Sequence, residues 1–560
     1  MKLKIVLPLV YSLVFMCFLA CKDQKQNPDL TSIDFLRGEL LLCGSGQFGE
    51  LKFSLSCNYE TRADFDLAVA LLHSFQYADA EKAFVKVIDA DPNCPMAYWG
   101  VAMSIYHAAW FPPSEKDLIK GSKVLDVAKG LARDEKQRAY IDAIDSFYAD
   151  WQNVDHNTRA LRFEKEMEKI YLNYPEDVEA AIFYTLALYS TRDRVGKEYK
   201  NERKAGKILE SLFQDNPNHP GIAHYIIHNY DNPVLANRGL ETARRYAKIA
   251  PSSSHAQHMP SHIFTRLGIW EESIQSNIQS AESARCYKQA LNINDGFFEE
   301  IHALDYLVYA YLQQGDNASA EEEYNAISEI TSVHPLNVTA VMYPLAAIPA
   351  RLALENKNWI RAANLQLQET GLDWEQFPWQ KAMHHFTRAL GAAHTKDYSL
   401  AEAEIETLTE LHQSMLTEND RSKSIQVKQV EIQLKTAEAW LHFSKNDTKK
   451  GLVLMQEAVA LERNTNLHPL TPGDVLPAIE LLGDMLFASN QTEEALIAYE
   501  ENLSKTPERF NGLYGAANAA KQLGENEKAS HYFKKLIELT KDSKSDRVEI
   551  DEAKRFIEKV

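Results

Sequence analysis

One pattern recurs along this chain of 560 residues at a spacing of about 34 residues, and it constrains the fold more than any other feature. In each unit, small residues stand where two helices would cross, an aromatic residue follows in the second helix, and in several units a proline ends that helix. The pattern begins at Thr61, Leu476 and Phe510, and shorter stretches of it occur at 267–274, 358–363 and 396–401. Because a helix pair of this kind cannot bury its apolar face alone, neighbouring pairs are expected to stack into one solenoid.

Composition supports a helical fold and excludes some functions. The 22 glycines and 20 prolines are too few for an all-β chain, which needs many turns. Acidic residues outnumber basic ones by 79 to 60, so the formal charge is −19 at pH 7. A surface this acidic repels phosphate backbones and anionic lipid, so we expect no nucleic acid among the partners. The predicted fold class is therefore all-α, a solenoid of helix pairs.

Four strings in the repeat region are more specific than the helix-pair pattern. They read MAYWGVAM at 96–103, HYIIH at 224–228, HMPSHI at 258–263 and HPLTPG at 468–473. The helix pairs resemble tetratricopeptide (TPR) repeats, and these strings resemble a large family of bacterial TPR proteins with no assigned activity. The resemblance implies a right-handed superhelix whose concave groove holds a protein or peptide partner. On this basis residues 61–560 form a TPR-like solenoid, with one candidate subdivision at 415–424.

The first twenty residues have the pattern of an export signal. Two lysines precede an apolar run over 5–19, which is too short to span a bilayer and suits the core of a signal peptide. Ala20 and Cys21 follow, and this ending resembles a bacterial lipobox, although Phe18 stands where that signal usually has leucine. The resemblance implies cleavage after residue 20, lipid attached to Cys21, and a protein anchored in the cell envelope, in the periplasm or on the surface. An ordinary secretory signal with an incidental cysteine is the alternative.

Residues 21–60 are interpreted as a tether followed by a hairpin. Two apolar segments flank a glycine-rich turn over 40–53, so we expect a short β-hairpin there. Cys43 and Cys57 both lie in this part of the chain, and an oxidising compartment would allow a disulfide between them. A redox-active pair is the alternative. Cys94 and Cys286 are isolated in sequence and are expected to be buried thiols.

Histidines are concentrated in one part of the chain, since six of the 18 fall between positions 219 and 262. His224 and His228 are separated by one helical turn, which places them on one face of a helix. His258 and His262 have the same separation one repeat later, at equivalent positions of the next repeat. By resemblance to TPR proteins, these positions line the concave groove.

Further side chains are expected at the same groove. His255, His302 and Asp305 could complete a shell around the two histidine pairs. His73 and His107 are also one repeat length apart, which predicts a second histidine pair on the inner face. Pro260 fits this arrangement if the helix begins near residue 256, because a proline in the first turn removes no helical hydrogen bond.

Three interpretations of the histidines stay open at this level. Neutral imidazoles suit a divalent transition metal such as zinc, copper, nickel or iron. The same side chains could line a groove for a peptide or small anion without metal, or could bond only to one another and to the backbone. No familiar catalytic motif is present in the sequence. The sequence therefore favours a lipid-anchored TPR scaffold that binds a protein or peptide, with a metal-dependent enzyme or metal-handling protein as the alternative.

Overall fold

The computed structural model describes residues 30–41, 43–51, 53–54, 57, 59–109, 112–334, 338–417 and 424–559. The predicted signal segment over 1–20 and the predicted lipidation site Cys21 lie outside these residues. Within them the structure is helical and contains no β-strand, so the all-α prediction is confirmed.

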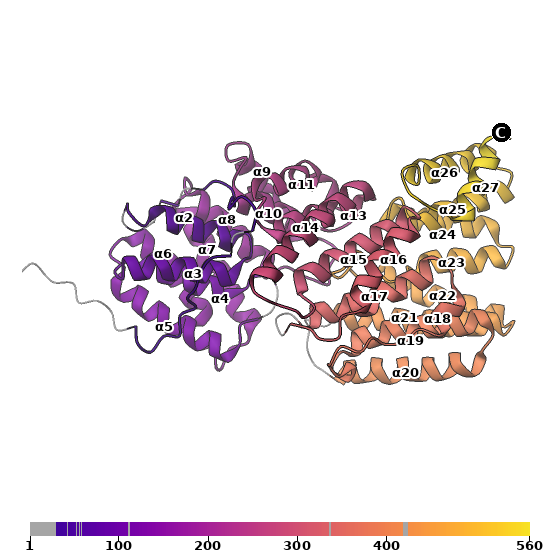
Figure 1. Ribbon diagram of the computed structural model, residues 1–560, viewed down its shortest axis with the longest axis horizontal. Helices are drawn as coiled ribbons and strands as arrows, with labels where there is room; N and C mark the ends of the chain where they lie inside the picture. Colours follow the sequence, from indigo (N-terminus) through magenta and orange to yellow (C-terminus); the bar gives the residue numbers. More distant parts are fainter. Residues whose placement is uncertain are drawn as a thin grey trace, which may run out of the picture.

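The helices follow one another as antiparallel neighbours (Figure 1). The first half of the chain contains α2 (Arg62–His73), α3 (Tyr77–Ala90), α4 (Pro95–Tyr106), α5 (Glu115–Leu131), α6 (Glu135–Tyr148), α7 (His156–Asn173), α8 (Val178–Ser190), α9 (Lys200–Phe213), α10 (Pro220–Tyr230), α11 (Ala236–Ile249), α12 (Ser254–His258), α13 (Pro260–Leu267) and α14 (Trp270–Ala290). The second half contains α15 (Phe298–Gln313), α16 (Asn317–Ser328), α17 (Val338–Glu355), α18 (Trp359–Ala363), the 3-10 helix η1 (Trp374–Gln376), α19 (Pro378–Thr395), α20 (Tyr398–Thr417), α21 (Ser424–Ser444), α22 (Thr448–Arg463), α23 (Ala478–Ala488), α24 (Thr492–Lys505), α25 (Phe510–Gln522), α26 (Asn526–Leu539) and α27 (Val548–Ile557).

Close contacts between glycine and an aromatic ring explain the repeat pattern. A Cβ added to Gly100 on α4 would fall 2.3 Å from the ring of Phe84 on α3. The same relation holds near the C-terminus, where a Cβ on Gly483 would fall 2.7 Å from the ring of Tyr499. A larger side chain at either glycine would push the two helices apart. The small and aromatic positions of the sequence pattern are therefore the points where paired helices touch.

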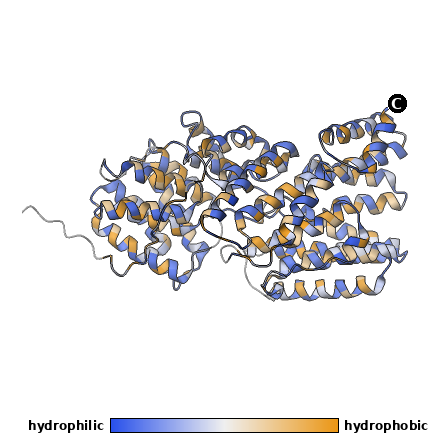
Figure 2. Ribbon diagram, viewed as in Figure 1, coloured by the Kyte–Doolittle hydropathy of each residue, from blue (hydrophilic) through white to orange (hydrophobic). Residues whose placement is uncertain are grey.

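The helix array runs from α2–α8 at one end of the molecule to α18–α27 at the other (Figure 1), and the turn between α24 and α25 contacts α14, α15 and α17. The indole nitrogen of Trp270, on α14, donates to the carbonyl of Glu508 at 2.7 Å. Arg509, in the turn before α25, is fully buried and bonds to Tyr309 and Glu355 at 2.9 Å. Apolar and polar residues alternate around the helices (Figure 2), and the apolar residues form the core between neighbouring pairs.

α17 is the only helix within the described residues that is long and apolar enough to cross a membrane by length and composition. Of the residues of this helix, 89% are buried in the structure. The apolar sequence of α17 is therefore explained by its place in the core.

The segment before α2 does not form the predicted hairpin. Phe48 and Phe53 are buried against the helices, which removes them from any pairing with each other. The backbone instead bonds to two interhelical loops: Glu50 N–H donates to the carbonyl of Asn218 at 3.0 Å, and Ser252 N–H donates to the carbonyl of Gln47 at 3.2 Å. The segment therefore lies along the helix array as an extended strap.

The predicted disulfide between Cys43 and Cys57 was wrong, as was the prediction of two free buried thiols. Cys43 is bonded to Cys286 on α14, and Cys57 is bonded to Cys94 at the start of α4. The Cα atoms in these pairs are 6.1 and 5.3 Å apart. The physical reason is the extended path of the strap, which brings each cysteine to a different helix.

Candidate metal centre

A cavity of about 590 Å³ lies on the inner side of the solenoid. Three charged side chains line it within the described part of the chain: Arg192, Asp193 and Arg194, from the loop after α8. Asp193 accepts the backbone N–H groups of its own turn, at 3.0 Å from residues 195 and 196. Seven histidines also line the cavity: His107, His156, His228, His255, His262, His302 and His468.

Helices from three successive repeats supply the central histidines. His224 and His228 lie on α10, and His302 lies on α15. His255 and His258 lie on α12, and His262 lies on α13. Met259 between α12 and α13 has helical dihedral angles, φ −53° and ψ −36°, so the backbone path continues through Pro260. The proline occupies the first position of α13, where its missing N–H costs little.

The two predicted histidine pairs belong to two separate groups of three rather than to one point. We name His258, His262 and His302 the α13 triad, and His224, His228 and His255 the α10 triad. In each triad one ligand atom from every residue lies within 4.8 Å of the others. His255 and His258 belong to different triads although both lie on α12, and their ring centroids are 6.5 Å apart.

In the α13 triad the positions of two protons follow from hydrogen bonding. His258 Nδ1 lies 2.7 Å from Oδ1 of Asn277, on α14. The amide of Asn277 is oriented by its other end, because Nδ2 donates to the carbonyl of Ser273 at 2.7 Å. Oδ1 must therefore accept, and the proton of His258 is on Nδ1.

His262 is oriented in the same way by a carboxylate. Its Nδ1 lies 2.8 Å from Oδ2 of Asp231. Burial alone would raise the pKa of Asp231, but Arg266 and His262 bring this pKa down to about 2. An ionised carboxylate can only accept, so His262 donates from Nδ1.

Both remaining Nε2 atoms face each other at 3.0 Å. Burial lowers the pKa of His258 to about 3, so its ring is neutral and its Nε2 carries a lone pair. In a neutral His262 ring, Nε2 carries a lone pair as well. Two lone pairs at this distance repel unless a cation lies between them. Two imidazole ligands of a tetrahedral metal ion have nitrogens about 3.3 Å apart, which is close to the observed separation.

The third member of this triad also points to a ligand. His302 is 7% exposed, and its buried Nδ1 has no hydrogen-bond partner in the described structure. Its ring centroid lies 4.4 Å from that of His258. Burial and the neighbouring histidines lower the pKa of His302 well below its ordinary value, so the ring is in the neutral form that binds metal.

The α10 triad has a related arrangement. His224 Nδ1 lies 2.6 Å from the backbone carbonyl of His73, which can only accept, so the proton of His224 is on Nδ1. Its Nε2 faces Nε2 of His255 at 3.0 Å. Burial lowers the pKa of His224 to about 3 and keeps its ring neutral.

A third cluster is explained without metal. His73 and His219 each place Nε2 2.9 Å from a different oxygen of Glu179. Burial lowers the pKa of His73, and the neutral ring donates from Nε2 to the carboxylate while Nδ1 bonds to the hydroxyl of Tyr225 at 3.0 Å. These partners satisfy the carboxylate, and none of the three residues lines the cavity.

Two predicted site residues lie elsewhere. His73 is fully buried in the Glu179 cluster, whereas His107 lines the cavity with its ring 4.4 Å from that of Tyr77, so they do not form a second groove pair. Asp305 forms a buried ion pair with Arg351 and does not belong to either triad. The sequence interpretation missed Asn277 and Asp231, which orient the histidines.

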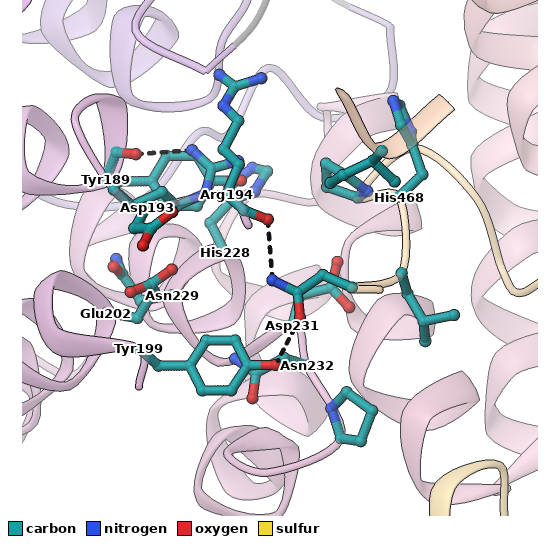
Figure 3. Close-up of a pocket in the computed structure, with 16 residues that line it drawn as sticks. Tyr189, Asp193, Arg194, Tyr199, Glu202, His228, Asn229, Asp231, Asn232 and His468 are labelled. Atoms are coloured by element: carbon teal, nitrogen blue, oxygen red, sulfur yellow. Dashed lines mark hydrogen bonds between the residues drawn. The ribbon is translucent and has the colours of Figure 1, made fainter. Parts of the chain in front are cut away.

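A loop from the second half of the chain closes the cavity. Asn466 donates from Nδ2 to the carbonyls of Arg194 and Gly196, at 2.9 and 3.1 Å. Figure 3 shows this region, where a small space of about 70 Å³ is lined by both His228 and His468. Burial, with Arg194 and Arg192 nearby, lowers the pKa of His468 to about 3. The loop at 466–470 therefore forms part of the cavity wall beside His228.

Comparison with known proteins supports the repeat. The family model described as tetratricopeptide repeat matches residues 511–543, which hold α25 and α26. One tetratricopeptide repeat therefore lies at 511–543, within an all-α array of helix pairs. This architecture is typical of proteins that bind other proteins.

Similar solved structures share low sequence identity with this chain. The human IFIT1 dimer with m7Gppp-AAAA is 14% identical, covers 88% of this chain and 92% of that chain, and has a TM-score of 0.36. Yeast Tom70 is 13% identical over 89% of this chain and 95% of that chain, with a TM-score of 0.32. The APC/C hetero-tetramer Cut9–Hcn1 is 11% identical over 89% of each chain, with a TM-score of 0.30. No curated protein matches the sequence.

Proposed function

We propose that this protein is a metal-dependent enzyme that acts on a small molecule in the cavity. One observation carries the proposal: His258 Nε2 and His262 Nε2 face each other at 3.0 Å, with both Nδ1 protons committed to Asn277 and Asp231. Metal-bound histidines characteristically donate their other ring N–H to a carboxylate or carbonyl in this way. A divalent transition metal such as zinc fits the three imidazoles of the α13 triad.

The position of the triad favours catalysis over a structural role. Structural zinc sites use four protein ligands, whereas catalytic sites use three and leave one position for water or substrate. His262 and His302 both line the cavity, so a fourth position would face its interior. When bound, a metal ion supplies a Lewis acid and lowers the pKa of bound water. A cavity of about 590 Å³ is large enough for a small-molecule substrate.

The first test measures metal in the purified protein. We expect stoichiometric metal by elemental analysis, or stoichiometric uptake of Zn²⁺ after chelation, and loss of this metal in His258→Ala. His384→Ala is the matched control, because His384 is also a buried neutral imidazole but lies on α19, outside both triads. Absence of metal in the wild type under both conditions would refute the proposal.

The second test asks whether a coordination position is open. Co²⁺-substituted protein should change its visible spectrum when azide is added, because azide would occupy the position that faces the cavity. A spectrum that azide leaves unchanged would indicate a closed site, and the enzymatic part of the proposal would fail.

We also propose that the chain is exported and anchored by lipid on Cys21 in the periplasm or at the cell surface. The pattern over 1–21 supports this, and so do the pairs Cys43–Cys286 and Cys57–Cys94, since disulfides persist in oxidising compartments. Mass spectrometry of the mature N-terminus tests the anchor, and an unmodified Cys21 would contradict it. Binding of a protein partner along the inner face stays a prediction for surfaces outside the cavity.

A further inference from the structure

The two histidine triads lie side by side and share one helix. α12 contributes His255 to the α10 triad and His258 to the α13 triad, from positions less than one helical turn apart. Their rings are separated by 6.5 Å between centroids. Each triad has two members in the lining of the same cavity, namely His228 and His255 in one and His262 and His302 in the other.

The α10 triad has the features that mark the α13 triad as a ligand set. Its histidine ligand atoms also lie within 4.8 Å of one another. One ring, His224, is held by a carbonyl on Nδ1 at 2.6 Å, which directs the Nε2 lone pair toward His255 Nε2 at 3.0 Å. The ligand atoms of His73, Glu179 and His219 meet the same distance limit, but the Glu179 carboxylate accepts from both histidines and none of the three residues lines the cavity.

We propose that the α10 triad binds a second divalent transition-metal ion, so that the cavity wall holds a two-metal centre. This inference rests on the proposed function, since it places the second ion beside the one in the α13 triad. The centre would be ligated by histidines alone, three to each ion, and His255 and His258 on α12 would set the separation of the two ions. A metal ion at the α10 triad replaces the proton that otherwise lies between His224 and His255.

Two ions facing one cavity also define the class of substrate. Divalent metal ions act as Lewis acids on phosphoryl and carbonyl oxygens. Arg192 adds positive charge to the same cavity, and it forms no ion pair among the described residues. The ligand class that fits this wall is a small molecule with an anionic, oxygen-rich group.

Metal stoichiometry tests the inference directly. After chelation, the protein is reconstituted with Zn²⁺, freed of unbound metal and measured by elemental analysis. We expect two ions per chain in the wild type, one in His224→Ala and one in His258→Ala, and none in the double variant. His384→Ala should retain two.

The outcomes separate the inference from the proposed function. One ion in the wild type that is lost in His258→Ala but kept in His224→Ala would overturn the second site and leave the first intact. One ion lost in either variant would indicate a single shared ion and would also overturn it. Absence of metal in the wild type would refute both proposals.

A second measurement tests proximity and guards against loss of fold. Protein reconstituted with Cu²⁺ should give an electron paramagnetic resonance spectrum with dipolar coupling between two ions. His224→Ala should give the spectrum of an isolated ion, and so should His228→Ala, which alters the α10 triad at the cavity wall. Circular dichroism confirms that each variant is folded. Two bound ions without coupling would refute the two-metal centre.

Discussion

Replacing Asn277 with leucine should weaken metal binding by about 10- to 100-fold while leaving the helices intact. In the metal-bound state, His258 must keep its proton on Nδ1, and Oδ1 of Asn277 accepts that proton at 2.7 Å. Leucine leaves this buried N–H without a partner, which costs about 1–3 kcal/mol. In the metal-free state the proton can move to Nε2 and donate to His262 Nε2 at 3.0 Å, so this state is spared the cost.

The expected loss follows from the difference between these two states. A cost of about 1.4 kcal/mol corresponds to a tenfold change in the dissociation constant, so the range above spans about one to two orders of magnitude. This agrees with the 10- to 100-fold losses that are typical when a group that orients a metal ligand is removed. The assay is competition of the metal-free protein with a chelating dye for Zn²⁺, together with thermal unfolding in the absence of metal.

Two further variants make the test specific. Asn277→Asp keeps an acceptor for His258 Nδ1 and should retain the metal affinity. Ser261→Ala removes a hydroxyl 3.3 Å from the same Oδ1 without touching a histidine nitrogen, and should have little effect. If Asn277→Leu binds metal as tightly as the wild type, the tautomer of His258 is not fixed by Asn277, and the reasoning fails.

Three other predictions address the cavity, the strap and the pH dependence. Arg192→Gln should weaken the binding of inorganic phosphate to the metal-loaded protein by about tenfold or more, because a hydrogen bond from a charged group contributes about 1.5–3 kcal/mol. Calorimetry measures this affinity. Arg203→Gln is the control and should leave the affinity unchanged, because Arg203 does not line the cavity. Replacing Cys43 and Cys286 together with serine should lower the free energy of unfolding by about 2–4 kcal/mol, since this disulfide spans 243 residues, and an unchanged denaturation midpoint would contradict its role. Burial lowers the pKa of His394 to about 4, below the unfolded value of about 6.5. The unfolded state therefore binds the proton first as the pH falls below about 6.5, and the protein loses up to about 2 kcal/mol of its free energy of unfolding by pH 5. His394→Phe should flatten the pH dependence of urea unfolding between pH 7 and 5.

The sequence predicts the helices well because their determinants are local. The turn between α13 and α14 falls at Gly268, whose φ of +70° suits glycine, and the repeat that begins at Phe510 coincides with the start of α25. The same periodicity places the two histidine pairs on adjacent repeats. These features depend on spacing along single helices, which the sequence contains directly.

The grouping of the histidines depends on how helices are placed against one another. His258 and His262 lie one repeat after His224 and His228. His255 joins the first pair and His302 joins the second, which gives two separate triads. The repeat spacing sets which face each side chain is on, but not the shift of α12 along α10. Asn277 and Asp231 reach the triads from α14 and from the turn after α10, and no spacing in the sequence links them to the histidines.

The strap was mispredicted because a local pattern competes with long-range contacts. Two apolar segments around glycines favour a hairpin when considered alone. In the folded chain Phe48 and Phe53 gain more by burial among helices than by pairing, and the backbone finds partners in loops that lie far along the chain, before α10 and before α12. The cysteines follow the strap, so their pairing could not be derived from their separation in sequence.

Arg266 connects the α13 triad with the loop before α23. Its Nε donates to Asp231 at 2.9 Å, and Asp231 in turn orients His262 at 2.8 Å. Its two other nitrogens donate to the carbonyls of Pro472 and Thr471, at 2.7 and 3.2 Å. A buried charged side chain that loses one partner becomes strongly unfavourable, so these three bonds must form together. The loop therefore orients Arg266, and Arg266 orients Asp231. Asp231 in turn accepts the Nδ1 proton of His262, so that Nε2 faces His258. The packing of this loop against the inner side of the solenoid thus also orients His262.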